Sequence, residues 1–179
     1  MAELSDEIIM NRVKQGNLPE MSSLFERYHV RLYNFFLKLT FDKAVSQDLT
    51  QNLFYRVIKY RHTFKDDNSF KSWIYQMARN VHADYRKQNK RTGDRFENVE
   101  EYDENIAEHT AAFTEEEYEQ LDKALLKLHP DQLEIIVLSR FQGLKYEEIS
   151  KIQNSTVANI KVKMHRAIKQ LREIYFKQI

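Results

Sequence analysis

Residues 129–171, HPDQLEIIVLSRFQGLKYEEISKIQNSTVANIKVKMHRAIKQL, determine how the C-terminal part of this chain folds. Their apolar spacing predicts a helix, a turn at Gly143, a short amphipathic helix over 145–152, a tight turn at Asn154, and a long basic helix. Gly and Asn tolerate the left-handed conformation that such turns need, and Thr156 is a good N-cap for the last helix. Two helices joined in this way form a helix-turn-helix, whose cationic second helix fits the major groove of DNA.

The long basic helix has two different faces. Its apolar stripe consists of Ile160, Met164, Ala167, Leu171 and Ile174. The opposite face and its flanks carry Ala158, Asn159, Lys161, Val162, Lys163, His165, Arg166 and Lys169. This pattern predicts that the C-terminal part reads DNA, although a solvated basic helix in an ordinary bundle would show a similar one.

Composition restricts the class of protein. Of 179 residues, 42% are hydrophobic, which is enough for a packed core, while three Gly and two Pro are few for a sheet-rich fold. Long stretches of helical periodicity predict an all-α protein. Without Cys, the chain has neither a disulfide framework nor a thiolate zinc site. It has no run of roughly 18–20 apolar residues and no signal-peptide core, so we expect a cytoplasmic protein without membrane insertion.

Charge divides the chain into three blocks, although the net charge is only +1. Residues 1–92 hold 16 Lys and Arg against 10 Asp and Glu, residues 93–119 hold one against 11, and residues 120–179 hold 11 against six. We therefore predict two small helical domains, an N-terminal helical bundle over 1–92 and a C-terminal helix-turn-helix domain over 118–179.

The acidic segment between them is predicted to be a flexible linker over 93–117, because it has few residues that can form a core. Two roles are open for it. It is either a solvated spacer or a mimic of nucleic acid that shields the basic domains or enters a basic channel of a partner. At its end, Thr114 followed by three Glu resembles an N-cap and the acidic first turn of a helix.

Four helices are predicted in the N-terminal block, at about 4–15, 20–40, 43–62 and 68–90. The third has apolar stripes made of Leu49, Leu53, Phe54, Val57 and Ile58. Its remaining polar face carries Asp48, Gln51 and Tyr55. A polar face of this kind is either the solvated edge of a bundle, which the pattern favours, or a docking surface.

The fourth predicted helix has a core stripe made of Phe70, Trp73, Ile74, Met77, Val81 and Tyr85. Its other face carries Ser72, Tyr75, Arg79, Asn80, His82, Arg86, Lys87 and Lys90. Cationic groups beside an aromatic ring and an amide suit single-stranded nucleic acid, but a solvated basic face explains the pattern as well. The polar loop before this helix, 61–69, is suited to present side chains to an extruded base.

Patterns typical of catalysis are missing. The three glycines are far apart, so there is no phosphate-binding loop. The six histidines show neither an i,i+4 pair nor the spacing of metal ligands. We therefore expect no enzyme, no cofactor, no metal and no small-molecule substrate.

Four segments, in order, resemble the extracytoplasmic-function (ECF) sigma factors, small members of the sigma-70 superfamily of bacterial transcription initiation factors. The first is LFERYHVRLYNFFLKL at 24–39, and the second is AVSQDLTQNLFYRVIKYRHTF at 44–64. FKSWIYQMARNVHADYRKQNKR at 70–91 is similar to the family's F-x-x-W-[IL]-x-x-[IM]-A-[RV]-N segment. LHPDQLEIIVLSRFQGLKYEEIS at 128–150 is similar to its second domain.

The resemblance implies a protein that binds core RNA polymerase and directs it to promoters by recognising −10 and −35 elements. Docking on the clamp helices of the largest polymerase subunit would involve Asp48, Leu49, Gln51, Asn52 and Tyr55. The melted −10 strand, with one base flipped into a pocket, would meet His62, Lys65, Asp66, Asn68, Tyr75, Arg79, Asn80 and Arg86. The −35 element would meet Thr156, Ala158, Asn159, Lys161, Val162, Lys163 and Arg166.

Further partners implied by the resemblance are the polymerase flap and an anti-sigma factor that holds the protein inactive; the linker would enter the polymerase active-site and exit channels. The chain also departs from the family pattern. Asn52 stands where Glu is usual, and Asn154 and the pair Ala158 and Asn159 replace a turn Gly and a Gly-Thr pair. The −10 helix has few aromatics for stacking, which predicts limited melting power and stringent promoter demands.

Two other classes of function fit parts of the pattern. A DNA-binding activator would combine the helix-turn-helix with an N-terminal sensor or dimerisation domain and would bind DNA without polymerase. A protein-binding helical module would use neither basic helix for DNA. The segment 43–90 favours the sigma factor. An activator does not need the polar face of the helix at 43–62 beside the basic face of the helix at 68–90.

Overall fold

The structure, a computed structural model, describes residues 4–92 and 114–177, and its elements in these two ranges are all helical. The first range contains α1 (Asp6–Lys14), η1 (Leu18–Glu20), α2 (Met21–Thr40), α3 (Lys43–Lys59), η2 (Arg61–Thr63) and α4 (Phe70–Thr92). The second contains α5 (Glu115–Leu126), α6 (Pro130–Ile136), η3 (Val137–Phe141), α7 (Tyr146–Ile152) and α8 (Val157–Phe176). The prediction of an all-α protein is confirmed, and most of the predicted acidic linker lies outside the described residues.

Side-chain caps fix where the helices begin. Asp42 Oδ1 accepts a hydrogen bond from the backbone N–H of Val45 at 2.9 Å at the start of α3. Thr114 and Glu117 form a reciprocal capping box at the start of α5, as the run of acids after Thr114 predicted. Such caps satisfy backbone donors that have no partner inside the helix.

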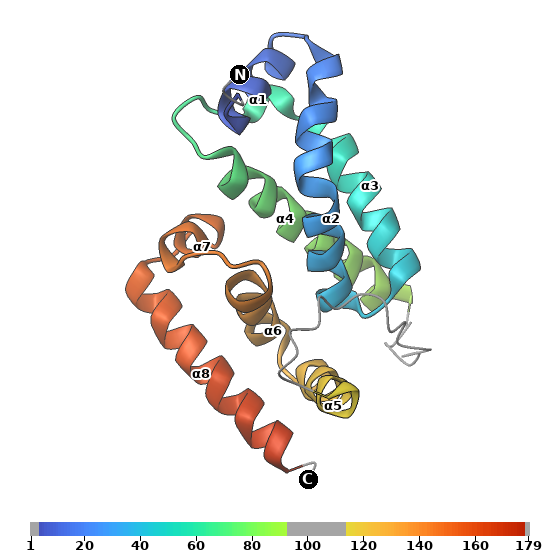
Figure 1. Ribbon diagram of the computed structural model, residues 1–179, viewed down its shortest axis with the longest axis vertical. Coiled ribbons are helices and arrows are strands. Elements are labelled where there is room, and N and C mark those ends of the chain that lie inside the picture. Colours follow the sequence, from blue (N-terminus) through green and yellow to red (C-terminus); the bar gives the residue numbers. More distant parts are fainter. Residues whose placement is uncertain (1–3, 93–113, 178–179) are drawn as a thin grey trace.

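The N-terminal domain packs α2, α3 and α4 against each other, with α1 across one end (Figure 1). Its core contains most of the apolar stripes predicted for α3 and α4, but Ile58 of the α3 stripe is 37% exposed. Fully buried side chains in it include Leu24, Leu32, Phe35, Leu53 and Ile74. Burial of such side chains is worth roughly 1.5–3 kcal/mol each, which explains why the stripes face inward.

The C-terminal domain consists of α5 to α8, with the inner face of α8 packed on α6 and α7 (Figure 1). Ile160, Met164 and Ala167 of the predicted stripe are buried, and Leu171 and Ile174 are partly buried against them. One turn, at Gly143, precedes α7, and a second, at Asn154, joins α7 to α8, so the predicted helix-turn-helix is confirmed.

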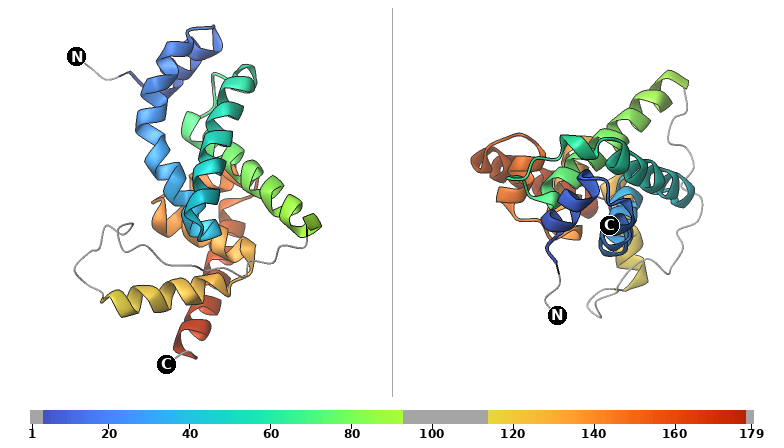
Figure 2. Two further views of the ribbon diagram at one scale, coloured as in Figure 1. Left: turned by 90° about the vertical axis from the view of Figure 1, so that its right-hand side faces the viewer. Right: turned by 90° about the horizontal axis from the view of Figure 1, so that it is seen from above.

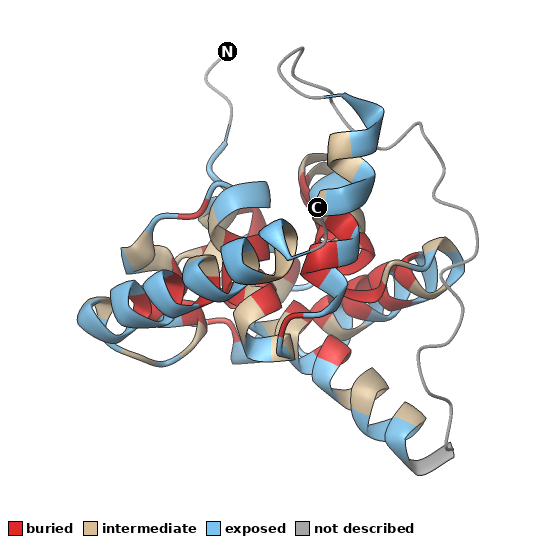
Figure 3. Ribbon diagram, turned by 90° about the horizontal axis from the view of Figure 1, so that it is seen from below, coloured by how far each residue is buried: buried red, intermediate tan, exposed pale blue. Residues whose placement is uncertain are grey.

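The two domains share one continuous cluster of buried residues. The ribbons in Figures 1 and 2 place α4 beside α7, and the two helices are in contact. Buried residues line the facing sides of the helices in Figure 3, while exposed residues cover the outer sides. The sequence predicted two domains but not that they would bury a surface against each other.

A π-helical segment, η3, follows α6 and was not predicted. The backbone N–H of Gln142 donates to the carbonyl of Val137 at 2.9 Å, five residues earlier, instead of four. This wider turn ends at Phe141 and Gln142, both of which contact the N-terminal domain.

Candidate nucleic-acid interface

The helix-turn-helix has the two turns that the sequence predicted. Gly143 and Asn154 both have positive φ, at 66° and 48°. Asn154 therefore adopts the left-handed conformation without being a glycine, which Asn does more readily than most residues. Thr156 caps α8, because its Oγ1 accepts a hydrogen bond from the backbone N–H of Asn159 at 3.2 Å.

The outer face of α8 is open to solvent. All seven residues predicted for the −35 element are exposed: Thr156, Ala158, Asn159, Lys161, Val162, Lys163 and Arg166. Asn159 Nδ2 donates to Ser155 Oγ at 2.8 Å, and Lys163 Nζ donates to Gln153 Oε1 at 3.3 Å. These two bonds hold the Asn159 and Lys163 side chains in the N-terminal half of α8. That half of a recognition helix is the part that meets base edges.

The segment 61–69, which comprises η2 and the loop that follows it, also presents most of its polar side chains outward. The four residues predicted there for the −10 strand are exposed: His62, Lys65, Asp66 and Asn68. The aromatic rings of Phe64 and Phe70 are buried at the two ends of the loop. The loop is therefore anchored on the core at both ends, with a polar tip.

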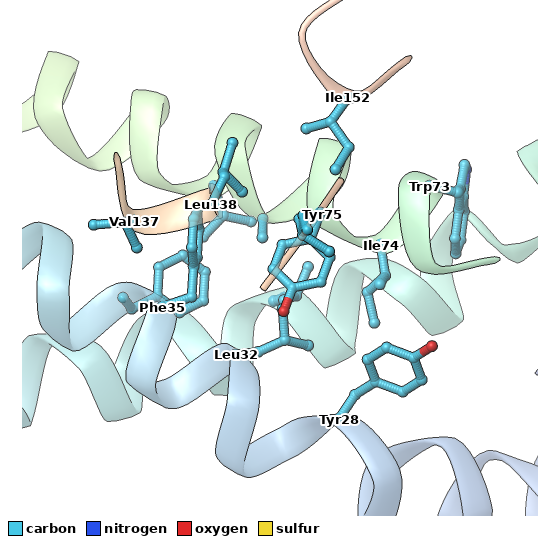
Figure 4. Packing of buried hydrophobic residues seen from close by; sticks show 14 of the residues in the cluster. Tyr28, Leu32, Phe35, Trp73, Ile74, Tyr75, Val137, Leu138 and Ile152 are labelled. Atoms are coloured by element: carbon cyan, nitrogen blue, oxygen red, sulfur yellow. The ribbon is translucent and has the colours of Figure 1, made fainter. Parts of the chain in front are cut away.

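Of the α4 residues predicted for the −10 strand, Asn80 is exposed as expected and Arg86 is half-buried. Tyr75 does not follow the prediction. It lies on the face predicted to be open, yet it is only 1% exposed, and its hydroxyl donates to Gln142 Oε1 at 2.7 Å. Figure 4 shows side chains from both domains around it, and its ring packs edge-on against Phe35. Burial raises the pKa of the Tyr75 hydroxyl.

His82 on the same face is buried as well, with 7% of its surface exposed. Its Nε2 makes no hydrogen bond to the described residues. Burial, with a smaller contribution from the nearby Arg86 charge, lowers the pKa of His82 to about 4. The expected exposed basic face of α4 is thus partly covered, because the helix packs on both sides.

Arg79 is bonded to the C-terminal domain. Its Nε lies 2.6 Å from Glu134 Oε1 of α6, and its Nη1 donates to the backbone carbonyl of Ile152 at 3.1 Å. Gln153 Nε2 donates to the same Glu134 oxygen at 2.8 Å. The guanidinium therefore meets a carboxylate and the carbonyl end of α7, both of which attract a cation.

Two further ion pairs join the domains, and both have the same polarity. Lys71 Nζ lies 3.0 Å from Glu148 Oε1, and Lys38 Nζ lies 2.9 Å from Asp122 Oδ1 and 5.0 Å from the centroid of the Phe141 ring. Burial raises the pKa of Asp122, and Lys38 opposes that effect. The N-terminal domain supplies each cation and the C-terminal domain each acid, so two basic domains attract each other locally.

Sequence reasoning missed these acids as functional residues. The signal available was that the block 120–179 holds only six Asp and Glu, and three of them, Asp122, Glu134 and Glu148, face the other domain. Their partners lie in α2 and α4, and nothing local in the sequence links the two sets.

The polar face of α3 is exposed as predicted at Asp48, Gln51, Asn52 and Tyr55, with Tyr55 63% exposed. Leu49 differs from them, because it is only 6% exposed and belongs to the core. The backbone at position 49 can support a docking surface, but the Leu49 side chain is not available to a partner in this conformation.

The described residues contain no cluster of three or more His, Cys, Asp or Glu placed to hold a metal ion. Within the same residues, no helix combines the length and hydrophobicity needed to cross a membrane.

Two family models match the chain. The model described as Sigma-70 region 2 matches residues 24–92, and the one described as Sigma-70, region 4 matches residues 118–171. The first covers most of α2 and all of α3 and α4, and the second covers most of α5 to α8.

Relatives match along most of their length. The ECF RNA polymerase sigma factor SigM of Bacillus subtilis is 29% identical over 163 residues, covering 87% of this chain and 94% of the relative. SigX of the same organism is 28% identical, covering 84% of this chain and 80% of its own length. The RNA polymerase sigma factor CarQ of Myxococcus xanthus is 27% identical, with 92% and 94% covered.

Two solved structures share the fold. CnrH in complex with the cytosolic domain of CnrY has a TM-score of 0.74 at 20% identity and covers 97% of this chain and 99% of that one. The sigma factor RpoE in complex with the anti-sigma factor NepR from Bartonella quintana has a TM-score of 0.66 at 24% identity, with 87% and 96% covered.

Proposed function

The chain belongs to the sigma-70 family and is of the ECF type, and we propose that it binds core RNA polymerase and directs it to promoters with specific −10 and −35 elements. One observation carries this proposal: a sigma-70 region 2 domain and a sigma-70 region 4 domain stand in one chain, and the recognition helix of the second is fully open on its outer face. In this role the protein is an initiation factor and not an enzyme.

Recognition of the −35 element is assigned to the outer face of α8. Its exposed Lys161, Lys163 and Arg166 provide cations for phosphates, while the exposed Asn159 and Val162 suit base edges and thymine methyl groups. The cap at Thr156 supports this role, because it gives the N-terminal turn of α8 a fixed start.

Recognition of the −10 element is assigned to the loop 61–69 and to α4. Asn80 and the loop are accessible, but Tyr75 and Arg79 are engaged by the C-terminal domain. A −10 strand that contacts all of these residues therefore requires the domains to separate. We propose that the observed arrangement is a closed form and that binding to core polymerase favours the open one.

Docking on polymerase is assigned to the polar face of α3, with Asp48, Gln51, Asn52 and Tyr55 as its exposed residues. This face lies outside the domain contact, so the closed form can still present it to the clamp helices. A solvated edge with no partner, which the pattern alone favoured, is the alternative.

Regulation by an anti-sigma factor is part of the proposal. It is supported by the likeness of fold to RpoE, which was solved in complex with the anti-sigma factor NepR, and to CnrH, which was solved in complex with the cytosolic domain of CnrY. We also propose that the protein acts in the cytoplasm. Its N-terminal domain would end near residue 92, and its C-terminal domain would begin near residue 118.

The test is run-off transcription with core RNA polymerase on a promoter library, with and without the full chain. We expect start sites that appear only when the chain is added, and their upstream sequences would define both elements. If core polymerase gains no start sites while the chain alone binds specific duplexes, the activator would replace the sigma factor as the function.

A further inference from the structure

Helix α1 contacts the loop 61–69, although it lies outside the residues 24–92 that the region 2 family model matches. Lys14, at the C-terminal end of α1, donates from Nζ to the backbone carbonyl of Phe64 at 2.9 Å. The same ammonium donates to Asp66 Oδ1 at 3.1 Å. One side chain thus holds both the start of the loop and a residue of its tip.

Glu7, near the N-terminal end of α1, holds the other end of the loop. Its Oε1 accepts a hydrogen bond from the backbone N–H of Phe70 at 3.0 Å, where α4 begins. The first N–H groups of a helix have no partner within it, and a carboxylate at this position is favoured by the helix dipole. Seven residues separate Glu7 from Lys14, which is about two helical turns, so both side chains lie on one face of α1.

The tip of the loop, residues 65–68, lies between these two contacts. The backbone N–H of Asn68 donates to the carbonyl of Lys65 at 3.0 Å, which closes a turn. Its side chains are exposed, whereas the rings of Phe64 and Phe70 beneath it are buried with centroids 6.2 Å apart. The tip is therefore free at its outer side and held from below and from both ends.

We propose that Glu7 and Lys14 are positioning residues for −10 recognition, and that α1 holds the turn 65–68 ready to receive an unstacked base of the −10 strand. The inference rests on the proposed function, because it assumes that this turn meets the strand. A loop that is already ordered binds without the cost of ordering, and because it is held in one conformation it cannot reshape to fit a mismatched base, so it discriminates between sequences more sharply. Neither residue needs to touch DNA for this effect.

The experiment uses the full chain with core polymerase and a promoter library that is randomised at the −10 element and constant at the −35 element. Lys14→Met removes both contacts of the ammonium, and Lys14→Arg restores a donor. Arg12→Met is the matched control, because Arg12 lies on the same helix and pairs with Glu20 at 2.9 Å, away from the loop. Thermal unfolding of each variant checks that the domain is intact.

We expect Lys14→Met to lower the preference for the best −10 sequence over its single-base variants by about three- to tenfold, as the loss of a solvent-accessible hydrogen bond of ordinary strength predicts. Lys14→Arg should recover most of the preference, and Arg12→Met should leave it unchanged. Glu7→Gln, which keeps an acceptor but loses the charge, should lower it in the same way and provides a second variant if Lys14→Met does not fold.

An unchanged −10 preference in folded Lys14→Met and Glu7→Gln would overturn the inference while leaving the proposed function intact. So would an equal loss of transcription at every −10 sequence, which is the result expected of a purely structural role. If the unaltered chain produced no start sites at all, the proposed function would fail, and the inference would fail with it.

Discussion

Arg79 Nε lies 2.6 Å from Glu134 Oε1, so a side chain that the family resemblance assigns to the −10 strand is bonded to a carboxylate of the C-terminal domain. Both side chains are largely shielded from water, with 30% and 14% of their surfaces exposed. A carboxylate presents an arginine with acceptor oxygens much as a phosphate does. On the proposed assignment of Arg79 to the −10 strand, Glu134 and the promoter compete for the same guanidinium, so closure of the domains would oppose binding of that strand.

The first prediction concerns this contact. Glu134→Gln removes the charge that Arg79 meets and should weaken closure by about 1–2 kcal/mol, which is roughly a 5- to 30-fold increase in the ratio of open to closed molecules. The chain has no Cys, so two introduced at exposed Gln47 and Gln170 can be labelled selectively for energy transfer between the domains. Energy transfer should fall in the variant. Asp131→Asn, at an exposed acid of the same helix, is the control, and equal transfer in both variants would refute the competition.

The second prediction concerns pH and stability. The pKa of His82 in the folded chain is lowered from 6.5 to about 4. Between pH 4 and pH 6.5, His82 is therefore mostly protonated in the unfolded chain and mostly neutral in the folded chain. Stability should therefore be constant for this group above pH 6.5 and fall as the pH decreases toward 4, by about 3 kcal/mol at most. Urea unfolding at pH 7 and pH 4.5 measures the difference. His82→Leu should reduce it, whereas His165→Gln on the exposed face of α8 should not.

The third prediction concerns polymerase docking. Asp48 is exposed on α3, so Asp48→Arg should leave the fold unchanged. Reversal of the charge at an electrostatically complementary surface should weaken binding to core polymerase by at least about tenfold. Fluorescence polarisation of labelled chain titrated with core enzyme gives the affinity. Glu119→Arg, a charge reversal at an exposed residue of α5 that is paired with Lys123, serves as the comparison. Wild-type affinity in Asp48→Arg would remove α3 from the docking surface.

The fourth prediction concerns the recognition helix. Lys161 is exposed on α8, and if it contacts a phosphate, Lys161→Ala should weaken binding of −35 duplexes uniformly and lower the slope of log affinity against log salt by about 1. If it contacts a base edge instead, one position of the element should lose its preference. Duplex binding over a salt series distinguishes the two, with Lys127→Ala at the exposed C-cap of α5 as the control. An affinity equal to wild type at every salt concentration would place Lys161 outside the interface.

The helices and the helix-turn-helix could be predicted because their signals are local. The stripe Ile160, Met164 and Ala167 repeats at the helical period, and all three side chains are buried. Thr156 caps α8 and Asn154 makes the turn, as their side-chain chemistry indicated. The π-helical form of Val137–Phe141 could not be predicted, since the apolar spacing of these residues fits an ordinary α-helix equally well.

The site was predicted only in part, and Tyr75 shows why. Its position on α4 follows from the helical period, but its partner Gln142 lies 67 residues away in the chain. A tyrosine has an apolar ring and a polar hydroxyl, so it suits an exposed nucleic-acid surface and a buried domain contact equally well. Leu49 also differs from the prediction. It belongs to the motif predicted for docking, but its side chain is buried in the core.

The amino-acid sequence thus determined the all-α class, the helix boundaries to within a few residues and the exposed face of α8, because capping and periodicity act between residues four or fewer apart. The tertiary structure decided which basic residues are available. The ion pairs at Lys38, Lys71 and Arg79 and the contacts of Lys14 with the loop join residues 50 or more apart in the chain. Such contacts depend on how whole helices pack, and an isolated charge pattern does not specify that.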